Sequence, residues 1–369
     1  MNLYDTYTYK EIMQQQTFWP EAVQAADVKE KFKALVSEKK KKGNLKIYFS
    51  GAGTSAYVGD ILSRMLKTSG DISFHAAATT DIVTEPEEYF KDGDNIILFS
   101  FARSGNSPET KGTVTLADQL SADISHVFVT NNKDGYLARY EGEAVKIILP
   151  EETNDRSLAM TSSFSTMLIA AASLFDTELS GSFTNDLKET FSKVETFAAE
   201  VLKDDFKKIF YVGTGVNSEM TRETSLKMNE LTGGRIDVSR ETTLGFRHGP
   251  KAALTEGALF IQLYSKTDQS YIHQYERDIT SEVTAFNHYY KVIITPSKSL
   301  LPDDLNENCR VLETGTEYSG FELSLIYLLF GQLLACMKSH QLSINPDEPS
   351  PDGFINRVVE GVTLYDYDK

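Results

Sequence analysis

The residues best suited to chemistry follow an apolar run at 94–100, in the segment ARSGNSPET at 102–110. Ser107 and Pro108 are typical of the N-cap and the first position of a helix, so we expect a helix to begin there. The turn before it offers consecutive N–H groups and hydroxyls at the positive end of that helix, which suits a phosphate monoester. The candidate anion-binding residues are Arg103, Ser104, Gly105, Asn106, Ser107 and Thr110. Read alone, this loop fits a well-capped helix that binds nothing about equally well.

Two further turns carry hydroxyl groups. The segment FSGAGTSAYVGDIL at 49–62 is a strand, a glycine turn and a helix start, and it offers Gly53, Thr54 and Ser55. Ala56 occupies the place of the third glycine in a dinucleotide-binding fingerprint, so a simple tight turn explains this segment equally well. The segment AMTSSFST at 159–166 adds Thr161 and Ser162 at a predicted helix start. Ligands gather at the carboxyl edge of open parallel sheets, so these turns are predicted to share one site.

The second half of the sequence supplies acid and base groups. Glu223, Lys227 and Glu230 lie at i, i+4 and i+7, on one face of a predicted helix. Most stripes of this kind are solvent-exposed salt bridges, and that alternative stays open. His248 precedes Gly249-Pro250, a rigid turn that would fix the imidazole. The remaining histidines show no metal-ligand spacing and are interpreted as structural: His75, His126, His273, His288 and His340.

These residues need a scaffold of parallel strands. Apolar rather than alternating runs, separated by helix-length segments, indicate strands buried on both faces of a sheet. The first set of predicted strands is 45–50, 71–77, 94–100, 124–130 and 144–150, closed by a helix at 164–175. The second set is 207–213, 234–240, 257–265, 290–296 and 309–314, closed by a helix at 319–340.

Five strands and a closing helix therefore occur twice, which indicates an internal duplication of an α/β unit. The loop at 263–276, which corresponds to the anion-binding segment, lacks the Ser-Gly-Asn-Ser pattern. We therefore expect the second half to keep the fold without a phosphate site. The predicted organisation is a helical segment at 1–42, α/β domains at 43–195 and 196–345, and an irregular tail at 346–369.

Composition limits the function classes. A formal net charge of -16 argues against nucleic acid or an anionic membrane as the main partner, although local donors can still bind a phosphorylated ligand. The two cysteines, at 309 and 336, form no metal-binding or redox motif. The apolar stretch at 322–337 is short for a membrane span and is predicted to be a buried helix. The prediction is a soluble, cytoplasmic, globular protein.

Four segments together resemble the SIS (sugar isomerase) family: GAGTSA at 51–56, ARSGNSPET at 102–110, ETSLKMNEL at 223–231 and GFRHGPKAAL at 245–254. They stand in that family's order and spacing, and the resemblance covers nearly the whole chain. It extends to the isomerase half of glucosamine-6-phosphate synthase. It is stronger for the bacterial tagatose-6-phosphate ketose/aldose isomerase and galactosamine-6-phosphate deaminase group, through NDRSLAMTSSF, ELTGGRI, LGFRHGPK and NRVVEGVT. The fold implied by the resemblance is two flavodoxin-like αβα sandwiches.

The resemblance also implies roles for the residues. Ser55, Ser104, Ser107 and Thr110 match phosphate-contacting positions, with a small-molecule sugar phosphate as the ligand. Glu230 matches the base that moves a proton between C1 and C2. His248 matches the residue that opens the sugar ring, in the synthase from the other subunit, so a homodimer or homotetramer is implied. Lys227 and Glu223 match charged positions near the base, and hydroxyls of Thr161 or Ser162 are candidate donors to the developing oxyanion.

The implied reaction converts galactosamine 6-phosphate to tagatose 6-phosphate and ammonia, without a metal or a nicotinamide cofactor. The alternatives are a plain aldose–ketose isomerase, a glucosamine-6-phosphate deaminase or deglycase, and a non-catalytic sugar-phosphate-binding regulator. Two positions depart from the synthase pattern. Ala102 replaces a serine, and Glu360 stands where the synthase has a lysine.

Overall fold

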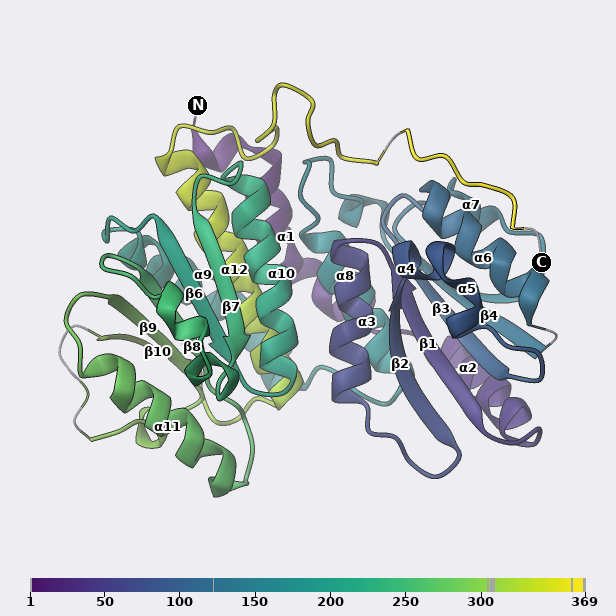
Figure 1. Cartoon of the computed structure of the whole chain (residues 1–369), viewed down its shortest axis with the longest axis horizontal. Helices are drawn as coiled ribbons and strands as arrows, with labels where there is room; N and C mark the ends of the chain where they lie inside the picture. The colour runs from purple at the N-terminus through teal and green to yellow at the C-terminus, as the bar shows by residue number, and fades with distance from the viewer. Residues whose placement is uncertain (1, 122, 304, 306–308, 360, 368–369) are drawn as a thin grey trace. The chain divides into compact units, whose positions relative to one another are not determined.

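The computed structural model describes residues 2–121, 123–303, 305, 309–359 and 361–367. It contains two compact units, each with one parallel sheet (Figure 1). The first-sheet unit comprises Thr17–Arg156, Met160–Glu178 and Asp352–Lys369. The second-sheet unit comprises the residues up to Gln16, Ser157–Ala159 and Leu179–Pro351. The domain boundaries expected from the sequence stay a prediction.

Both predicted sets of strands are present. The first sheet contains β1 (Leu45–Gly51), β2 (Ile72–Ala78), β3 (Asn95–Ala102), β4 (Asp123–Thr130) and β5 (Ala144–Ile148). The second contains β6 (Lys208–Gly213), β7 (Asp237–Thr242), β8 (Leu259–Leu263), β9 (Tyr290–Thr295) and β10 (Cys309–Glu313). The strand orders are β2-β1-β3-β4-β5 and β7-β6-β8-β9-β10, so the two sheets have the same flavodoxin-like topology. The predicted fold class is confirmed.

Helices cover both faces of the first sheet. One face carries α2 (Ala26–Lys40), α3 (Thr54–Met65) and α8 (Ser162–Leu174), and the other carries α4 (Thr79–Thr84), α5 (Pro86–Tyr89) and α6 (Pro108–Leu120). The short α7 (Tyr136–Arg139) lies beside β4 and β5. On the α2 side, Phe99 packs edge-on against Phe32, whereas Ile96 and Leu98 pack with Leu116 on the α6 side. Burial on both faces explains why the inner strands β1 and β3 are mostly apolar.

The second sheet is covered in the same way. α9 (Gly181–Val201), α10 (Val216–Leu231) and α12 (Gly320–Gln341) pack together, and α10 contacts β6 and β7. α11 (Ser270–Thr284) covers another part of the sheet, where Ile279 and Val283 pack with Phe210 and Phe260. Short turns of 3-10 helix follow β7 at Gly245–Arg247 and Pro250–Ala253. The N-terminal α1 (Tyr7–Ala22) contributes its first turns to this unit.

α12 is the core helix of the second-sheet unit. Among the described residues it alone is long and apolar enough to cross a membrane, but 94% of its most apolar window is buried inside the protein. Its Gly331 lies against α10 so closely that a Cβ there would be 2.3 Å from Thr224 Cγ2. A capping box of Ser319 and Glu322 begins the helix. The apolar stretch at 322–337 is therefore a buried helix, as the sequence predicts.

Candidate functional site

The predicted anion-binding loop joins β3 to α6. Ser107 caps α6, accepting a hydrogen bond from the Thr110 N–H at 3.3 Å, and its hydroxyl lies 2.7 Å from that of Thr110. The loop is braced from one side, because Asn132 Nδ2 donates to the Ser104 carbonyl at 2.8 Å and Asn106 Oδ1 accepts from Tyr136 N at 2.9 Å. The N–H groups of Gly105 and Ser107 donate to no other residue within the described ranges. A rigid turn with donors available at a helix start can bind an anion.

The glycine turn after β1 lies beside this loop. β1 and β3 are neighbours in the sheet, with Ser50 opposite Ser100, so both turns leave the same edge. Gly53, with φ 54°, is the N-cap of α3 and places Thr54 and Ser55 in its buried first turn. A Cβ on Gly51 would be 2.5 Å from the Ser55 carbonyl carbon, so glycine is required for this close approach. The structure thus brings these two predicted turns together.

The third hydroxyl cluster has a different role. Thr161 and Ser162 are completely buried at the start of α8, and both hydroxyls donate to the carboxylate of Asp155, at 3.1 and 2.5 Å. Asp155 also accepts from Ser163 Oγ at 2.5 Å and from the N–H groups of all three residues. These donors already surround an internal anion. The geometry therefore does not support the expected role of Thr161 and Ser162 as donors to substrate.

Arg103 also departs from its expected role. Its guanidinium is 6% exposed and donates to the carbonyl oxygen of Arg357, in the C-terminal tail. Arg357 in turn donates from Nε to the Asp155 carbonyl at 2.8 Å and from Nη2 to Asn154 Oδ1 at 2.9 Å. Arg103 therefore holds the tail on the first-sheet unit. Glu360, the departure from the synthase pattern, lies outside the described residues.

The charged stripe on α10 is buried. The side chains of Glu223 and Lys227 have no exposed surface, and 23% of the Glu230 side chain is exposed. Lys227 Nζ lies 2.5 Å from Glu230 Oε2 and 3.4 Å from Glu223 Oε1. Burial lowers the pKa of Lys227, but the two carboxylates raise it by more, so it lies above the ordinary value. The solvent-exposed alternative is therefore wrong, and Lys227 is a buried ammonium ion.

Glu230 is placed to accept a proton. Its Oε2 is held by Lys227, whereas its Oε1 accepts from no other described residue. The helix ends at Leu231, just beyond it, and Thr232 Oγ1 bonds back to Met228 O at 2.6 Å. A carboxylate fixed through one oxygen and partly open to solvent at the other can act as a general base.

His248 lies at the end of a short 3-10 turn, and its N–H donates to Gly245 O at 2.9 Å. Its imidazole is exposed and forms no side-chain hydrogen bond with the described part of the chain. By contrast, His126 and His273 lie 2.8 and 2.9 Å from Asp118 and Glu276. His248 is therefore available to a ligand or to a second molecule.

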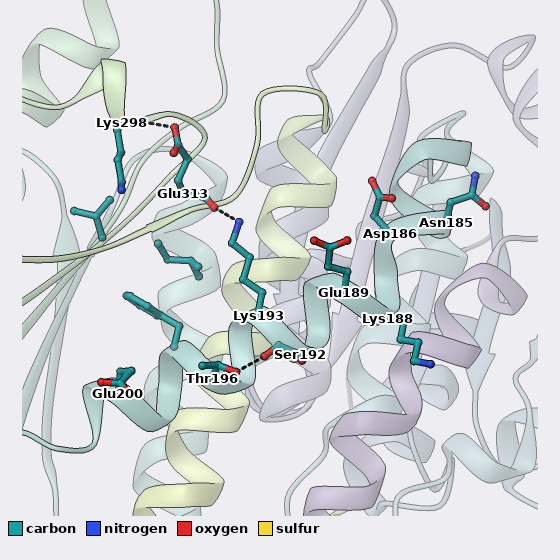
Figure 2. A pocket seen from close by; sticks show the side chains of 13 residues that line it. Asn185, Asp186, Lys188, Glu189, Ser192, Lys193, Thr196, Glu200, Lys298 and Glu313 are labelled. Carbon is teal, nitrogen blue, oxygen red and sulfur yellow. Dashed lines mark hydrogen bonds between the residues drawn. The ribbon is translucent and has the colours of Figure 1, made fainter.

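Neither of two large cavities in the second-sheet unit contains the predicted residues. A cavity of about 950 Å³ lies between α9 and β10 (Figure 2). Its charged groups are partly paired internally, since Lys193 Nζ donates to Glu313 O at 2.7 Å and Lys298 N to Glu313 Oε1 at 2.8 Å. A second cavity of about 540 Å³ is lined by Arg247 and Gly249, on either side of His248. Cavity size alone does not locate this site.

The structure thus forms two groups of candidate residues. The glycine turn and the Ser104–Ser107 loop share an edge of the first-sheet unit, and the Glu223, Lys227 and Glu230 group belongs to the second-sheet unit. The sequence interpretation missed Asp155 and Arg357. A cluster of three hydroxyls at a buried helix start needs an acceptor, and this requirement was the available signal for Asp155.

Comparison with known proteins identifies relatives over the full length. The SIS domain family model matches residues 41–176. The D-galactosamine-6-phosphate deaminase AgaS of Escherichia coli is 32% identical over 371 residues, covering 98% of this chain and 96% of that protein. The protein of the same name from Shewanella sp. (strain ANA-3) is 34% identical, covering 98% of this chain and 92% of its own. The crystal structure of tagatose-6-phosphate ketose/aldose isomerase from Escherichia coli has a TM-score of 0.85 and 28% identity, covering 99% of this chain and 98% of that one.

Proposed function

This chain belongs to the SIS family, in the group that contains the AgaS proteins, and from this premise we propose that it deaminates galactosamine 6-phosphate. It is a sugar-phosphate enzyme of the isomerase/deaminase class. The products would be tagatose 6-phosphate and ammonia. The names of the full-length relatives support this substrate, and the arrangement of Glu230 and Lys227 supports the proton transfer that the reaction requires.

The proposed chemistry begins with ring opening by His248, which moves a proton from the anomeric hydroxyl to the ring oxygen. In the open-chain aldehyde, the C2–H is acidified by the neighbouring carbonyl group. Glu230 Oε1 removes this proton while the aldehyde oxygen takes up a proton from water, giving an enolamine. Glu230 then returns its proton to C1 as the amine nitrogen loses a proton to water. The product is a C2 ketimine with a hydroxymethyl group at C1. Water adds to the C=N bond, and ammonia leaves as the ketose forms.

The observation that carries this proposal is the fixed carboxylate of Glu230. Lys227 Nζ holds Oε2 at 2.5 Å, which leaves Oε1 as the oxygen that can act as the base. Lys227 is itself fixed by Glu223, so the base is oriented before the substrate binds. A non-catalytic regulator would need no such arrangement.

The phosphate would bind between the glycine turn and the Ser104–Ser107 loop, far along the sugar from C1 and C2. Binding energy from such a remote group can orient the reacting carbons. We propose that His248 acts in the site of a second copy of the chain, in a homodimer or homotetramer. The imidazole of His248 is exposed and forms no side-chain hydrogen bond with any described residue, which supports its contribution to a neighbouring molecule.

The second candidate is a plain aldose–ketose isomerisation, favoured by the name of the Escherichia coli structure. An assay of ammonia and ketose with galactosamine 6-phosphate, glucosamine 6-phosphate, their N-acetylated forms and galactose 6-phosphate distinguishes the two. Ammonia release from galactosamine 6-phosphate is expected. Ketose formation from an aldose phosphate, with no ammonia from either hexosamine, would favour the isomerase.

Two variant experiments test the residue roles. Glu230→Gln should lower kcat by about 10²–10⁴-fold with nearly unchanged sugar-phosphate binding. Glu219→Gln, on the first turn of the same helix, is the control. Glu230→Gln turnover at the native rate would refute the base assignment. Mixing Glu230→Gln with His248→Ala should restore some activity through hybrid oligomers, and no recovery despite confirmed subunit exchange would place both residues in one chain's site.

A further inference from the structure

The two sheets repeat more than their strand order. β3 and β8 are the central strands of their sheets, and each is followed by a loop and a helix, α6 and α11. The glycine turns correspond as well: Gly215 has φ 60° and ψ -124° before α10, and Gly53 has φ 54° and ψ -127° before α3. The second half therefore contains the counterpart of the edge that is predicted to bind phosphate in the first half.

In this counterpart, the two turns are bonded directly to each other. Asn217 occupies the place that Ser55 has in the first half, two residues after the N-cap glycine. Its Nδ2 donates to the carbonyl of Tyr264, the residue after β8, at 3.1 Å. The Tyr327 hydroxyl donates to the same carbonyl at 2.6 Å. The edge of the second sheet is thus closed by protein groups.

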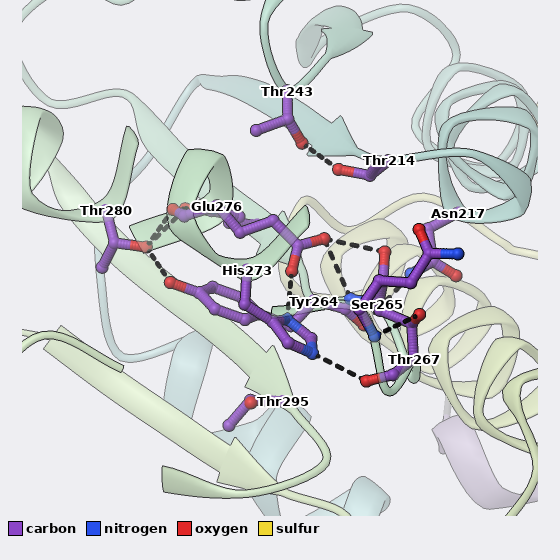
Figure 3. Close-up of polar contacts among 12 residues, drawn as sticks. Thr214, Asn217, Thr243, Tyr264, Ser265, Thr267, His273, Glu276, Thr280 and Thr295 are labelled. Carbon is purple, nitrogen blue, oxygen red and sulfur yellow. Dashed lines mark hydrogen bonds and ion pairs between the residues drawn. The ribbon is translucent and has the colours of Figure 1, made fainter. Parts of the chain in front are cut away.

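A carboxylate occupies the loop that follows β8 (Figure 3). Glu276 comes from α11, is completely buried, and accepts through Oε1 from Ser265 N at 3.0 Å and Ser265 Oγ at 2.7 Å. Its Oε2 lies 2.9 Å from His273 Nδ1. A backbone N–H, a hydroxyl and an imidazole are donors of the kind that bind an external oxyanion.

The imidazole supplies a compensating charge. His273 lies between two acceptors, Glu276 Oε2 and the Thr267 carbonyl, which is 3.1 Å from Nε2. Both contacts are hydrogen bonds only when both ring nitrogens carry protons. The hydrogen bond to Glu276 raises the pKa of His273, in agreement with this geometry. A buried carboxylate is costly without such a partner.

We propose that this cluster is a closed counterpart of the phosphate site, in which the Glu276 side chain is the resident anion. The native second half consequently takes no phosphorylated ligand, and each chain binds one sugar phosphate. Removal of the Glu276 carboxylate leaves a cradle of Ser265 and His273 that accepts a small monocarboxylate such as acetate. The comparison of this cluster with a phosphate site in the first half rests on the proposed function. The binding of acetate by Ser265 and His273 in the variant does not depend on that function.

Thermal unfolding in sodium acetate, against sodium chloride at equal ionic strength, tests the proposal without any activity assay. The Glu276→Ala variant should gain stability saturably with acetate, its folding constant rising about elevenfold at ten times the acetate dissociation constant. Native protein, Glu276→Gln and Asp278→Ala should be no more stable to heat in acetate than in chloride. Asp278 is exposed on the same helix and serves as the matched control.

A folded Glu276→Ala variant that responds no more than Asp278→Ala overturns the proposal, as does an equal acetate response in Glu276→Gln. Should Glu276→Ala fail to fold, the His273 titration in Glu276→Gln, followed by NMR, decides. A pKa below the native one supports the resident carboxylate, and an unchanged pKa refutes it. Neither result depends on the identity of the sugar substrate, so failure here is distinct from failure of the proposed function.

Discussion

Replacement of Lys227 by methionine tests the buried ion cluster on α10. Met has a similar length and no charge, so the variant removes the ammonium ion that lies 3.4 Å from the completely buried Glu223 carboxylate. Removing one partner of a buried pair costs about 3–5 kcal/mol of unfolding free energy. Glu230 contributes less to this cost, since 23% of its side chain is exposed and water can solvate its carboxylate. We therefore expect a loss of about 3–5 kcal/mol in Lys227→Met.

The double variant Lys227→Met/Glu223→Met makes the expectation sharper. Replacement of a whole buried pair by apolar residues is neutral or stabilising, so the double variant should recover most of the loss. Urea unfolding followed by circular dichroism measures both. Trp19, the one tryptophan, is buried in the first-sheet unit, so its fluorescence reports on the unit that the substitution does not touch.

Lys208→Met is the matched control, because Lys208 pairs with Asp237 at 2.9 Å with both side chains partly exposed. Such a surface pair contributes about 0–1 kcal/mol. The reasoning is refuted if Lys227→Met is as stable as Lys208→Met. It is also refuted if the double variant is no more stable than the single one, since the cost would then not arise from an uncompensated charge.

Three other predictions follow from described contacts. Ser107→Ala removes the N-cap of α6 and should lower the free energy of unfolding in urea by about 1 kcal/mol. It should also raise KM more than it lowers kcat, and an unchanged KM would show that this loop does not bind the phosphate. Gly331→Ala places a Cβ 2.3 Å from Thr224 Cγ2, so α10 must shift, and the free energy of unfolding should fall by about 1–3 kcal/mol. The shift should also reduce kcat, and a native kcat would show that the position of α10 is not critical for catalysis. The raised pKa of His273 stabilises the fold fully below its unfolded value of about 6.5, and this contribution is lost as pH rises through the folded pKa. Nearby Lys266 opposes the effect, and Glu276→Gln should abolish most of this pH dependence in thermal unfolding; an identical profile in the variant would contradict the assignment.

The fold could be predicted because its signals are local. Apolar runs mark the central strands of both sheets, β3 and β8, which are buried throughout, and Ser107-Pro108 marks the start of α6. The face shared by Glu223, Lys227 and Glu230 also follows from helical spacing alone. Whether that face is exposed cannot be read from the spacing, because burial of α10 depends on segments distant in the chain, such as α12, which packs against α10 at Thr224.

The partners of the polar side chains depend on tertiary contacts, and here the sequence is less informative. Thr161 and Ser162 have the residue types of a ligand site, but in the structure both hydroxyls donate to the carboxylate of Asp155. Arg103 stands next to an anion-binding loop, yet its guanidinium binds the Arg357 carbonyl, 254 positions away. The residue type of a hydroxyl or guanidinium group is the same whether the group binds substrate or another part of the protein. Its role therefore follows only from the groups that the fold places beside it.

The chain changes unit after Gln16, Arg156, Ala159, Glu178 and Pro351. The span that matches the SIS family, 41–176, is therefore not an excisable module. A fragment cut to that span would lose Phe32 of α2 and expose the rings of Phe99 and Phe175 that it covers. It would also lose Leu364, which packs beside Gly112 on α6. Shuffling halves between relatives should consequently exchange α2 and the C-terminal tail together with the first sheet, since an intact hydrophobic surface depends on these distant segments.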